Sequence, residues 1–254
     1  IDTISTGGTV AYAIECFENG LIDTNTTGGL ELTWGNTDAI IKLVDMIIKR
    51  EGLGDTLADG VKAAVEKIGP ESAKYAMHAG GQELPMHDSR NDPGWALAYQ
   101  SEPTPGRHTI ASYVDSDLRS GKEQFPEVKR MVKAAKTKQG KKVSLNTATS
   151  IYVQVINGCG VCIFGPDTMH YPIVDFLNAV TGWDMTADEY FKTGKRILNL
   201  RKAFTVREGI KPVDCKLPPR VTGNPPLTDG PLKNVSVDVD ALQEELCTIL
   251  GWDP

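Results

Sequence analysis

The sequence has few of the residues that hold small secreted or metal-stabilised proteins together. Five cysteines occur among 254 residues. This number is odd and too small for a disulfide scaffold, so it favours a reducing compartment. A chain of this length can bury enough apolar surface to fold without disulfides or a structural metal. We therefore expect a cytoplasmic globular protein with one large domain or two smaller ones.

Positive charge is also scarce, since 27 Lys and Arg residues stand against 33 Asp and Glu residues. Nucleic-acid binding needs a clustered positive surplus, so nucleic acid is not expected as the main partner. One stretch differs from the rest: Lys122 to Lys142 contains eight basic and two acidic residues. Such a run is usually a solvated helix face, although this one could dock an acidic protein such as a ferredoxin.

Long apolar runs are missing as well. The longest uncharged stretch, Val143 to Pro166, is interrupted by polar residues such as Asn146 and Gln154. We expect it to be buried in protein and not in lipid, with no membrane span and no signal peptide in the chain. The first residue is Ile1 and not Met, so we expect a piece of a longer polypeptide.

Helical periodicity dominates the pattern of apolar residues. A capping box of Thr186 and Glu189 predicts the start of a long helix that runs through Phe204. Other helices are predicted at 9–19, ending before Gly20, at 40–48 and 57–68, joined at Gly52–Gly54, at 128–135 and at 242–250.

Strand signals are few. Leu30 to Trp34 alternates briefly, and Gly81 to Met86 is compatible with an extended segment. The segments 85–109 and 217–231 are rich in Pro, Gly, Asp and Asn and are predicted to be irregular. The composition changes near residue 80. The predicted fold class is mainly α with very little β, in two helical domains, 1–80 and 81–254.

A glycine-rich turn, Asn157 to Gly165, follows the buried stretch and contains Cys159 and Cys162. Its glycines would let backbone N–H groups approach a bulky or anionic group, and its thiols have CxxC spacing. Taken alone, the segment is equally well explained as a buried turn with two structural cysteines. A single CxxC lacks a second pair of ligands, so any metal here would need ligands from outside this chain.

A second candidate is the loop Pro103 to Thr109. Two prolines and a glycine restrict its backbone, so Arg107 and His108 would be presented rigidly. An imidazole can exchange a proton near neutral pH. The spacing alone nevertheless favours a surface loop with a hydrogen-bonded histidine. His78, His87 and His170 have no spaced partners and are expected to be structural.

Read together, these motifs resemble the carboxyl-terminal part of the tungsten-dependent aldehyde:ferredoxin oxidoreductase family. Asp2 to Gly7 is similar to the end of the first pterin motif, and Asn157 to Cys162 to the second, D-x-x-G-L-C. Thr104 to His108 falls where the family places a histidine beside the metal. Three further segments match the family in its order: 81–90, Gly194 to Gly209 and Leu217 to Arg220.

The resemblance implies a tungsten or molybdenum ion held by two molybdopterins, together with one [4Fe-4S] cluster. Cys162 would be the fourth cluster ligand, and the other three cysteines would precede Ile1. Asp2, Asn157, Val161 and Arg107 would contact the pterins, with Asp2 and the Asn157 turn on opposite sides of one buried site. His108 would be the catalytic residue.

The implied activity is oxidation of an aldehyde to a carboxylic acid, with electrons passing to ferredoxin or an electron-transfer subunit in a homo- or hetero-oligomer. Asn157 and Val161 depart from the Asp and Leu of the motif, and Pro-Gly-Arg-His differs from the better known Arg-Gly-x-Cys-His loop. These departures indicate a side branch and leave the substrate open. The alternatives are a benzoyl-CoA type aromatic-ring reductase subunit and a non-catalytic helical assembly module.

Overall fold

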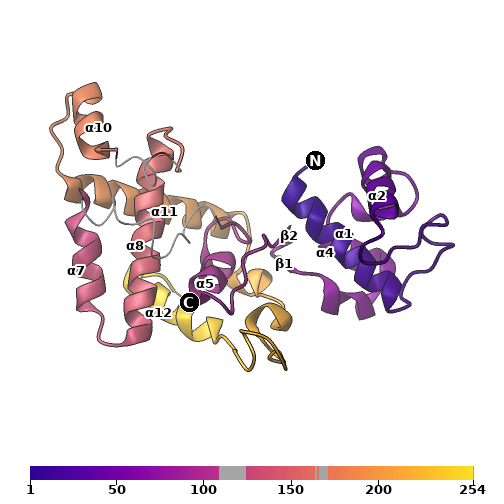
Figure 1. The fold of residues 1–254 in the computed structure, drawn as a ribbon. Helices are drawn as coiled ribbons and strands as arrows, with labels where there is room; N and C mark the ends of the chain where they lie inside the picture. Colours follow the sequence, from indigo (N-terminus) through magenta and orange to yellow (C-terminus); the bar gives the residue numbers. More distant parts are fainter. Residues whose placement is uncertain (109–123, 164, 166–170, 254) are drawn as a thin grey trace. The chain divides into compact units, whose positions relative to one another are not determined.

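The computed structural model describes residues 1–253 apart from 109–123, 164 and 166–170 (Figure 1). The chain divides into two compact units. Unit 1 comprises Ile1–Arg90 and Asp214–Ser236, and unit 2 comprises Asn91–Val213 and Val237–Pro254. The predicted boundary near residue 80 refers to domains of the family that the sequence resembles, and it stays a prediction.

Unit 1 begins with helix α1 (Thr3–Glu18), which starts earlier than predicted. The Asp2 carboxylate accepts a 2.7 Å hydrogen bond from the backbone N–H of Ser5 and so satisfies one of the free donors of the first turn. This cap allows the helix to include the polar residues before Thr9. The helix ends before Gly20, as predicted.

The prediction of one amphipathic helix at 57–68 is wrong, because the structure divides this segment between two helices. The chain forms α2 (Thr37–Lys49), α3 (Leu53–Leu57) and α4 (Val61–Ile68). Gly60 has a φ of 88°, a left-handed conformation that interrupts the helix. The Glu83 carboxylate accepts a 2.8 Å hydrogen bond from the N–H of Val61, which starts α4 anew.

Gly54, predicted to lie in a linker, belongs to α3. A Cβ at this position would lie 2.2 Å from the backbone of Met46 in α2. Only glycine therefore permits the close approach of these two helices.

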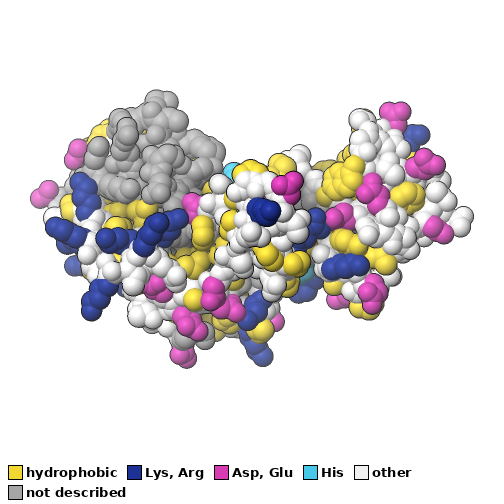
Figure 2. Space-filling view, turned by 60° about the horizontal axis from the view of Figure 1, so that its bottom comes forward, with side chains coloured by type: hydrophobic (Ala, Val, Ile, Leu, Met, Phe, Trp, Pro, Cys, Tyr) yellow, Lys and Arg dark blue, Asp and Glu magenta, His cyan; other side chains and the backbone are white. Residues whose placement is uncertain are grey.

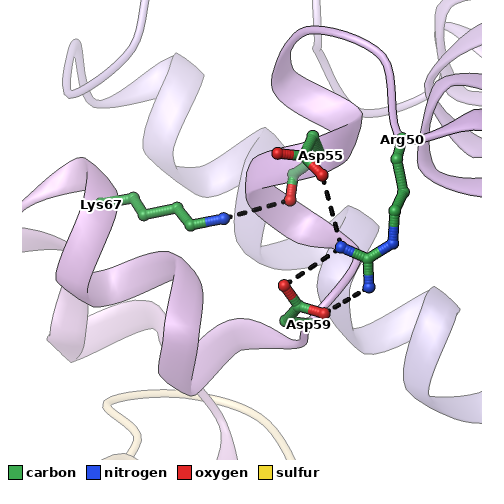
Figure 3. A network of polar contacts seen from close by, with 4 residues as sticks. All are labelled: Arg50, Asp55, Asp59 and Lys67. Atoms are coloured by element: carbon green, nitrogen blue, oxygen red, sulfur yellow. Dashed lines mark hydrogen bonds and ion pairs between the residues drawn. The ribbon is translucent and has the colours of Figure 1, made fainter.

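Four charged side chains connect α2 with α3 and α4 (Figure 3). Arg50 donates to Asp55 over 3.3 Å and to Asp59 over 3.2 Å, and Lys67 donates to the Asp55 carbonyl oxygen over 3.3 Å. The Arg50 guanidinium holds the pKa of Asp59 below its usual value. Because these side chains are about half exposed, solvent screens each pair and the pairs add little to the stability of the fold. The network fixes the turns between the helices more than it stabilises the unit.

The remaining elements of unit 1 are short. Strands β1 (His78–Ala79) and β2 (Gln82–Glu83) pair antiparallel, and 3₁₀ helices occupy Pro70–Tyr75 and Pro219–Thr222. The predicted strand at 30–34 is wrong. Side chains hold its backbone in place of a partner strand: Asn36 donates to the Glu31 carbonyl oxygen, and Glu18 accepts from the Trp34 N–H.

In unit 2, α8 (Lys138–Gly158) is the central helix. Figure 1 shows α7 (Pro126–Ala134) beside it and α11 (Ala187–Arg207) crossing it, and α12 (Val239–Leu250) also packs on it. Residues 143–156 are all buried, so this part of the long uncharged stretch lies inside protein as predicted. The stretch is not buried throughout, because Asn157 and Cys162 are exposed. The capping box of Thr186 and Glu189 is formed as predicted.

In the described part of unit 2, the helices α5 (Pro93–Ser101) and α10 (Ile173–Thr181) were not predicted. The first lies in a segment predicted to be irregular. Pro93 occupies its first turn, where a missing N–H costs nothing, and the Asp92 carboxylate accepts from the Gly94 N–H over 2.8 Å. Residues typical of loops thus act here as a helix start.

The mainly helical fold class is confirmed. Among the described residues, no helix is both long enough and apolar enough to cross a membrane. The 3₁₀ helix Pro212–Cys215 lies where the chain passes from unit 2 to unit 1.

Candidate functional site

A pocket of about 530 Å³ lies in unit 2 between α8, α11 and the loop after α5. We call it the α8–α11 pocket. Two arginines, two amides, a glycine and two isoleucines line it: Arg107, Gln154, Asn157, Gly158, Ile163, Ile197 and Arg201. None of these residues is acidic, so the lining favours a ligand that is anionic or rich in hydrogen-bond acceptors.

α8 and α11 approach closely beside this pocket because α11 has a glycine at the crossing. A Cβ at Gly194 would lie 2.4 Å from the carbonyl oxygen of Ile151 in α8. The close crossing brings Arg201 to Gln154, and the guanidinium donates to the Gln154 side-chain oxygen over 2.7 Å. Gln154 is only 1% exposed and also donates to the Ser150 carbonyl oxygen. Both polar ends of this amide are therefore fixed.

The last residue of α5 and the loop after it are attached to α11 by three side chains of α11. Arg201 donates to the Thr104 hydroxyl over 2.8 Å, and Lys202 donates to the Ser101 carbonyl oxygen over 3.1 Å. Thr205 donates to the Pro103 carbonyl oxygen over 3.1 Å. We call these three contacts the α11 clamp. The clamp holds the backbone that leads to Arg107 and His108.

Arg107 and His108 have different surroundings although they are adjacent. Arg107 is exposed and lines the α8–α11 pocket. His108 is half-buried, and its ring centroid lies 6.1 Å from that of Trp95 in α5. His108 is not among the lining residues, so the described structure brings Arg107 to the pocket and His108 beside it. The catalytic role of His108 stays a prediction.

The glycine-rich turn lies at the carboxyl end of α8. Gly160 has a φ of 70°, which lets its N–H reach the Asn157 carbonyl oxygen over 3.1 Å. Asn157 is exposed and lines the pocket, whereas Val161 is half-buried and does not. Cys162 is exposed and Cys159 is half-buried, and burial raises the pKa of the Cys159 thiol. The more accessible thiol is therefore the one predicted as a cluster ligand.

Asp2 belongs to unit 1 and acts as the cap of α1. It also lines a separate pocket of about 290 Å³ together with Ser5, Thr6 and Glu83. The hydrogen bond from the Ser5 backbone N–H lowers the pKa of Asp2. Contact of Asp2 with a pterin, and a site shared with the Asn157 turn of the other unit, stay predictions.

One buried carboxyl group lies next to the clamp. Glu102 is 4% exposed, and its Oε1 accepts a 2.5 Å hydrogen bond from the Ser150 hydroxyl of α8. Its Oε2 has no hydrogen-bond partner among the described residues. Burial raises the pKa of Glu102 to about 7, against the effects of the Ser150 bond and of the charges on Arg201 and Lys202.

Sequence reasoning missed Gln154, Arg201 and Glu102. Gln154 could have been noticed as a polar residue in an apolar helical run, but nothing local distinguishes Arg201 from the other basic residues of its helix. Thr109, Phe164 and His170, which belong to predicted features, lie outside the described residues. In the part of the chain that the structure describes, no three His, Cys, Asp or Glu side chains cluster as metal ligands.

Comparison with curated proteins gives relatives over almost the whole chain. The tungsten-containing aldehyde ferredoxin oxidoreductase of Pyrococcus horikoshii is 32% identical, with 99% of this chain and 40% of the relative covered. The protein of the same name from Pyrococcus furiosus is 33% identical, with the same coverage. A WOR-like subunit of an aliphatic sulfonate oxidoreductase from Pyrococcus furiosus is 26% identical over 38% of its length.

A solved structure has the same fold. It is the active-site complex BamBC of benzoyl coenzyme A reductase with 1,5-dienoyl-CoA, which matches with a TM-score of 0.71 over 100% of this chain and 42% of the other. At 21% identity this likeness shows the fold alone.

The relatives and the helical fold place the chain among oxidoreductase-like proteins. A sequence model of the aldehyde ferredoxin oxidoreductase family, domains 2 and 3, matches residues 1–254. The chain therefore belongs to that family, and the predicted resemblance is confirmed. It spans about 40% of the length of the curated relatives that it matches.

Proposed function

We propose that the chain is the carboxyl-terminal part of a cytoplasmic tungsten or molybdenum oxidoreductase that converts aldehydes to carboxylic acids. The observation that carries the proposal is the α8–α11 pocket, which brings Arg107 of one predicted motif to Asn157 of another. The names of the relatives support a tungsten-containing oxidoreductase.

The pocket suits one pterin of a bis-molybdopterin cofactor. Arg107 presents an exposed guanidinium group that can form bidentate bonds with a phosphate, and Arg201 adds a second positive charge. Asn157 presents an exposed amide that can pair with a heterocycle. A volume of about 530 Å³ falls within the range of pockets for small organic ligands. When bound, such a cofactor would take up the electrons of the aldehyde, and a [4Fe-4S] cluster would pass them on singly.

The residues of this chain would position the cofactor and the cluster, and would move a proton to or from the substrate. Asn157 lacks the charge of the usual Asp, so it would meet the pterin with a neutral amide. The accessible Cys162 would complete the cluster with cysteines from upstream. His108 can donate or accept a proton as the aldehyde carbon is attacked. The proposed electron acceptor is ferredoxin or an electron-transfer subunit.

The test is metal analysis and assay of the complete polypeptide purified without oxygen. We expect stoichiometric tungsten or molybdenum, about four iron atoms, and aldehyde-dependent reduction of a viologen dye. Metal without aldehyde oxidation but with reduction of an aromatic thioester would favour the ring-reductase alternative. Absence of both metals and iron would refute the enzymatic proposal and favour an assembly module.

A further inference from the structure

α7 and α8 form a groove of about 570 Å³ on unit 2. Five lysines border it: Lys129, Lys133, Lys138, Lys141 and Lys142. Three apolar residues, Val128, Val132 and Leu145, form its floor. On the left of Figure 2, Lys and Arg side chains gather beside apolar side chains. We call this feature the lysine groove.

No ion pair with a described residue neutralises the positive charge of the groove. None of the five lysines has an ion pair among the residues that the structure describes. Arg130, by contrast, is bonded to Glu127 over 2.5 Å and to Asp188 over 2.6 Å. The sequence of α8 contains no Asp or Glu. A local surplus of this kind in a chain with a net charge of −6 attracts an acidic partner.

The floor distinguishes between classes of acidic partner. Val128 and Leu145 are buried and do not protrude, so they cannot insert into a membrane as the apolar face of an interfacial helix does. None of the described residues that line the groove is aromatic, so these residues offer the bases of a single strand nothing to stack on. Two helix faces with an apolar floor and charged rims instead match the shape of an amphipathic helix.

We propose that the lysine groove docks an acidic amphipathic helix of a protein partner. Apolar side chains of that helix would cover Val132 and Leu145, and its carboxylates would face the lysine rows. The docking itself does not depend on the proposed function, whereas the choice of a bound subunit over an electron carrier rests on the proposed cluster at Cys162.

The position of the groove favours a permanently bound subunit as the partner over a mobile electron carrier. At 1.5 Å per residue, α8 extends about 25 Å from Lys141 to Gly158. The groove is therefore remote from the turn that carries Cys162. An electron carrier would have to dock closer to that turn.

The experiment measures binding of a fluorescent synthetic helix to the complete polypeptide. The probe has leucines at i, i+3, i+4 and i+7 and glutamates on both flanks. The test variant is Lys133→Glu with Lys141→Glu, both exposed residues whose replacement leaves the core intact. The matched control is Lys42→Glu with Lys192→Glu, which changes the net charge equally at exposed sites outside the groove.

We expect the test variant to bind the probe at least ~10-fold more weakly and the control to bind it as the unchanged protein does. Binding should weaken between ~0.05 and ~0.5 M salt, because the Debye length shortens several-fold. Val132→Ser should also weaken binding, since the floor contributes. Equal binding of a scrambled peptide, tighter binding of duplex DNA or of anionic vesicles, or no binding of the probe would overturn the proposal.

Discussion

Replacement of Arg201 by Met should loosen the loop that carries Arg107 and His108. The guanidinium joins this loop to α8 through hydrogen bonds of 2.8 Å to Thr104 and 2.7 Å to Gln154. Hydrogen bonds from a charged donor contribute ~1.5–3 kcal/mol, and the loss also leaves the buried Gln154 oxygen without a partner. Because Arg201 is half-buried, we take the lower end, about 1.5 kcal/mol. Loop opening should then become about tenfold more frequent.

The assay is hydrogen exchange of the peptide that covers residues 102–108. Its two prolines leave few amides, and one of them, Gly106 N–H, donates to the Tyr99 carbonyl oxygen over 2.9 Å. We expect about tenfold faster exchange in Arg201→Met and no change in Arg196→Met, an exposed arginine of the same helix. A double-mutant cycle with Thr104→Ala should give a coupling energy above ~0.5 kcal/mol. Unchanged exchange, or additive effects in the cycle, would refute the clamp.

Three further predictions concern individual residues. His108→Ala should lower aldehyde turnover by ~10²- to 10⁴-fold with metal and iron content unchanged, as expected for a positioned proton donor; full turnover would make it a structural loop residue. Cys162→Ala should abolish the EPR signal of the reduced cluster in the complete polypeptide, and Cys159→Ala should leave it, whereas the reverse pattern would contradict the ligand assignment. Glu102→Gln tests the raised carboxyl pKa. Because the pKa of Glu102 is about 7 in the fold against 4.5 when unperturbed, the fold binds the extra proton between these values, so this residue's contribution to stability falls as pH rises from 4.5 to 7. At ~1.4 kcal/mol per pH unit, the contribution of Glu102 to the free energy of unfolding falls by about 3 kcal/mol. The melting temperature of Glu102→Gln, relative to that of the unchanged protein, should therefore increase from pH 4.5 to 7 and stay constant above pH 7. The same difference in melting temperature between the two proteins at all pH values would show that the pKa of this carboxyl group is not raised.

The candidate site shows which features can be predicted from residues that are neighbours in the sequence. The Asn157 turn could be predicted because the glycines and cysteines that define it are neighbours in the chain. The α8–α11 pocket could not, since Arg201 reaches Thr104 across 97 positions in the sequence and Gln154 across 47. The family resemblance implied that Arg107 and Asn157 each contact a pterin, but only the structure showed that they line one pocket.

The sequence by itself determined most of the helices, because their signals act within one or two turns. The capping box of Thr186 and Glu189 and the apolar periodicity of α2, α7 and α12 are complete in the local sequence. Only the tertiary structure decided where helices break and which side chains meet. Gly60 interrupts a continuous apolar stripe because Glu83, 22 residues away, starts the next helix, and Glu102 is left with a raised pKa because α8 encloses it. Burial and long-range hydrogen bonds depend on how the helices pack, and that packing is not encoded in any single segment.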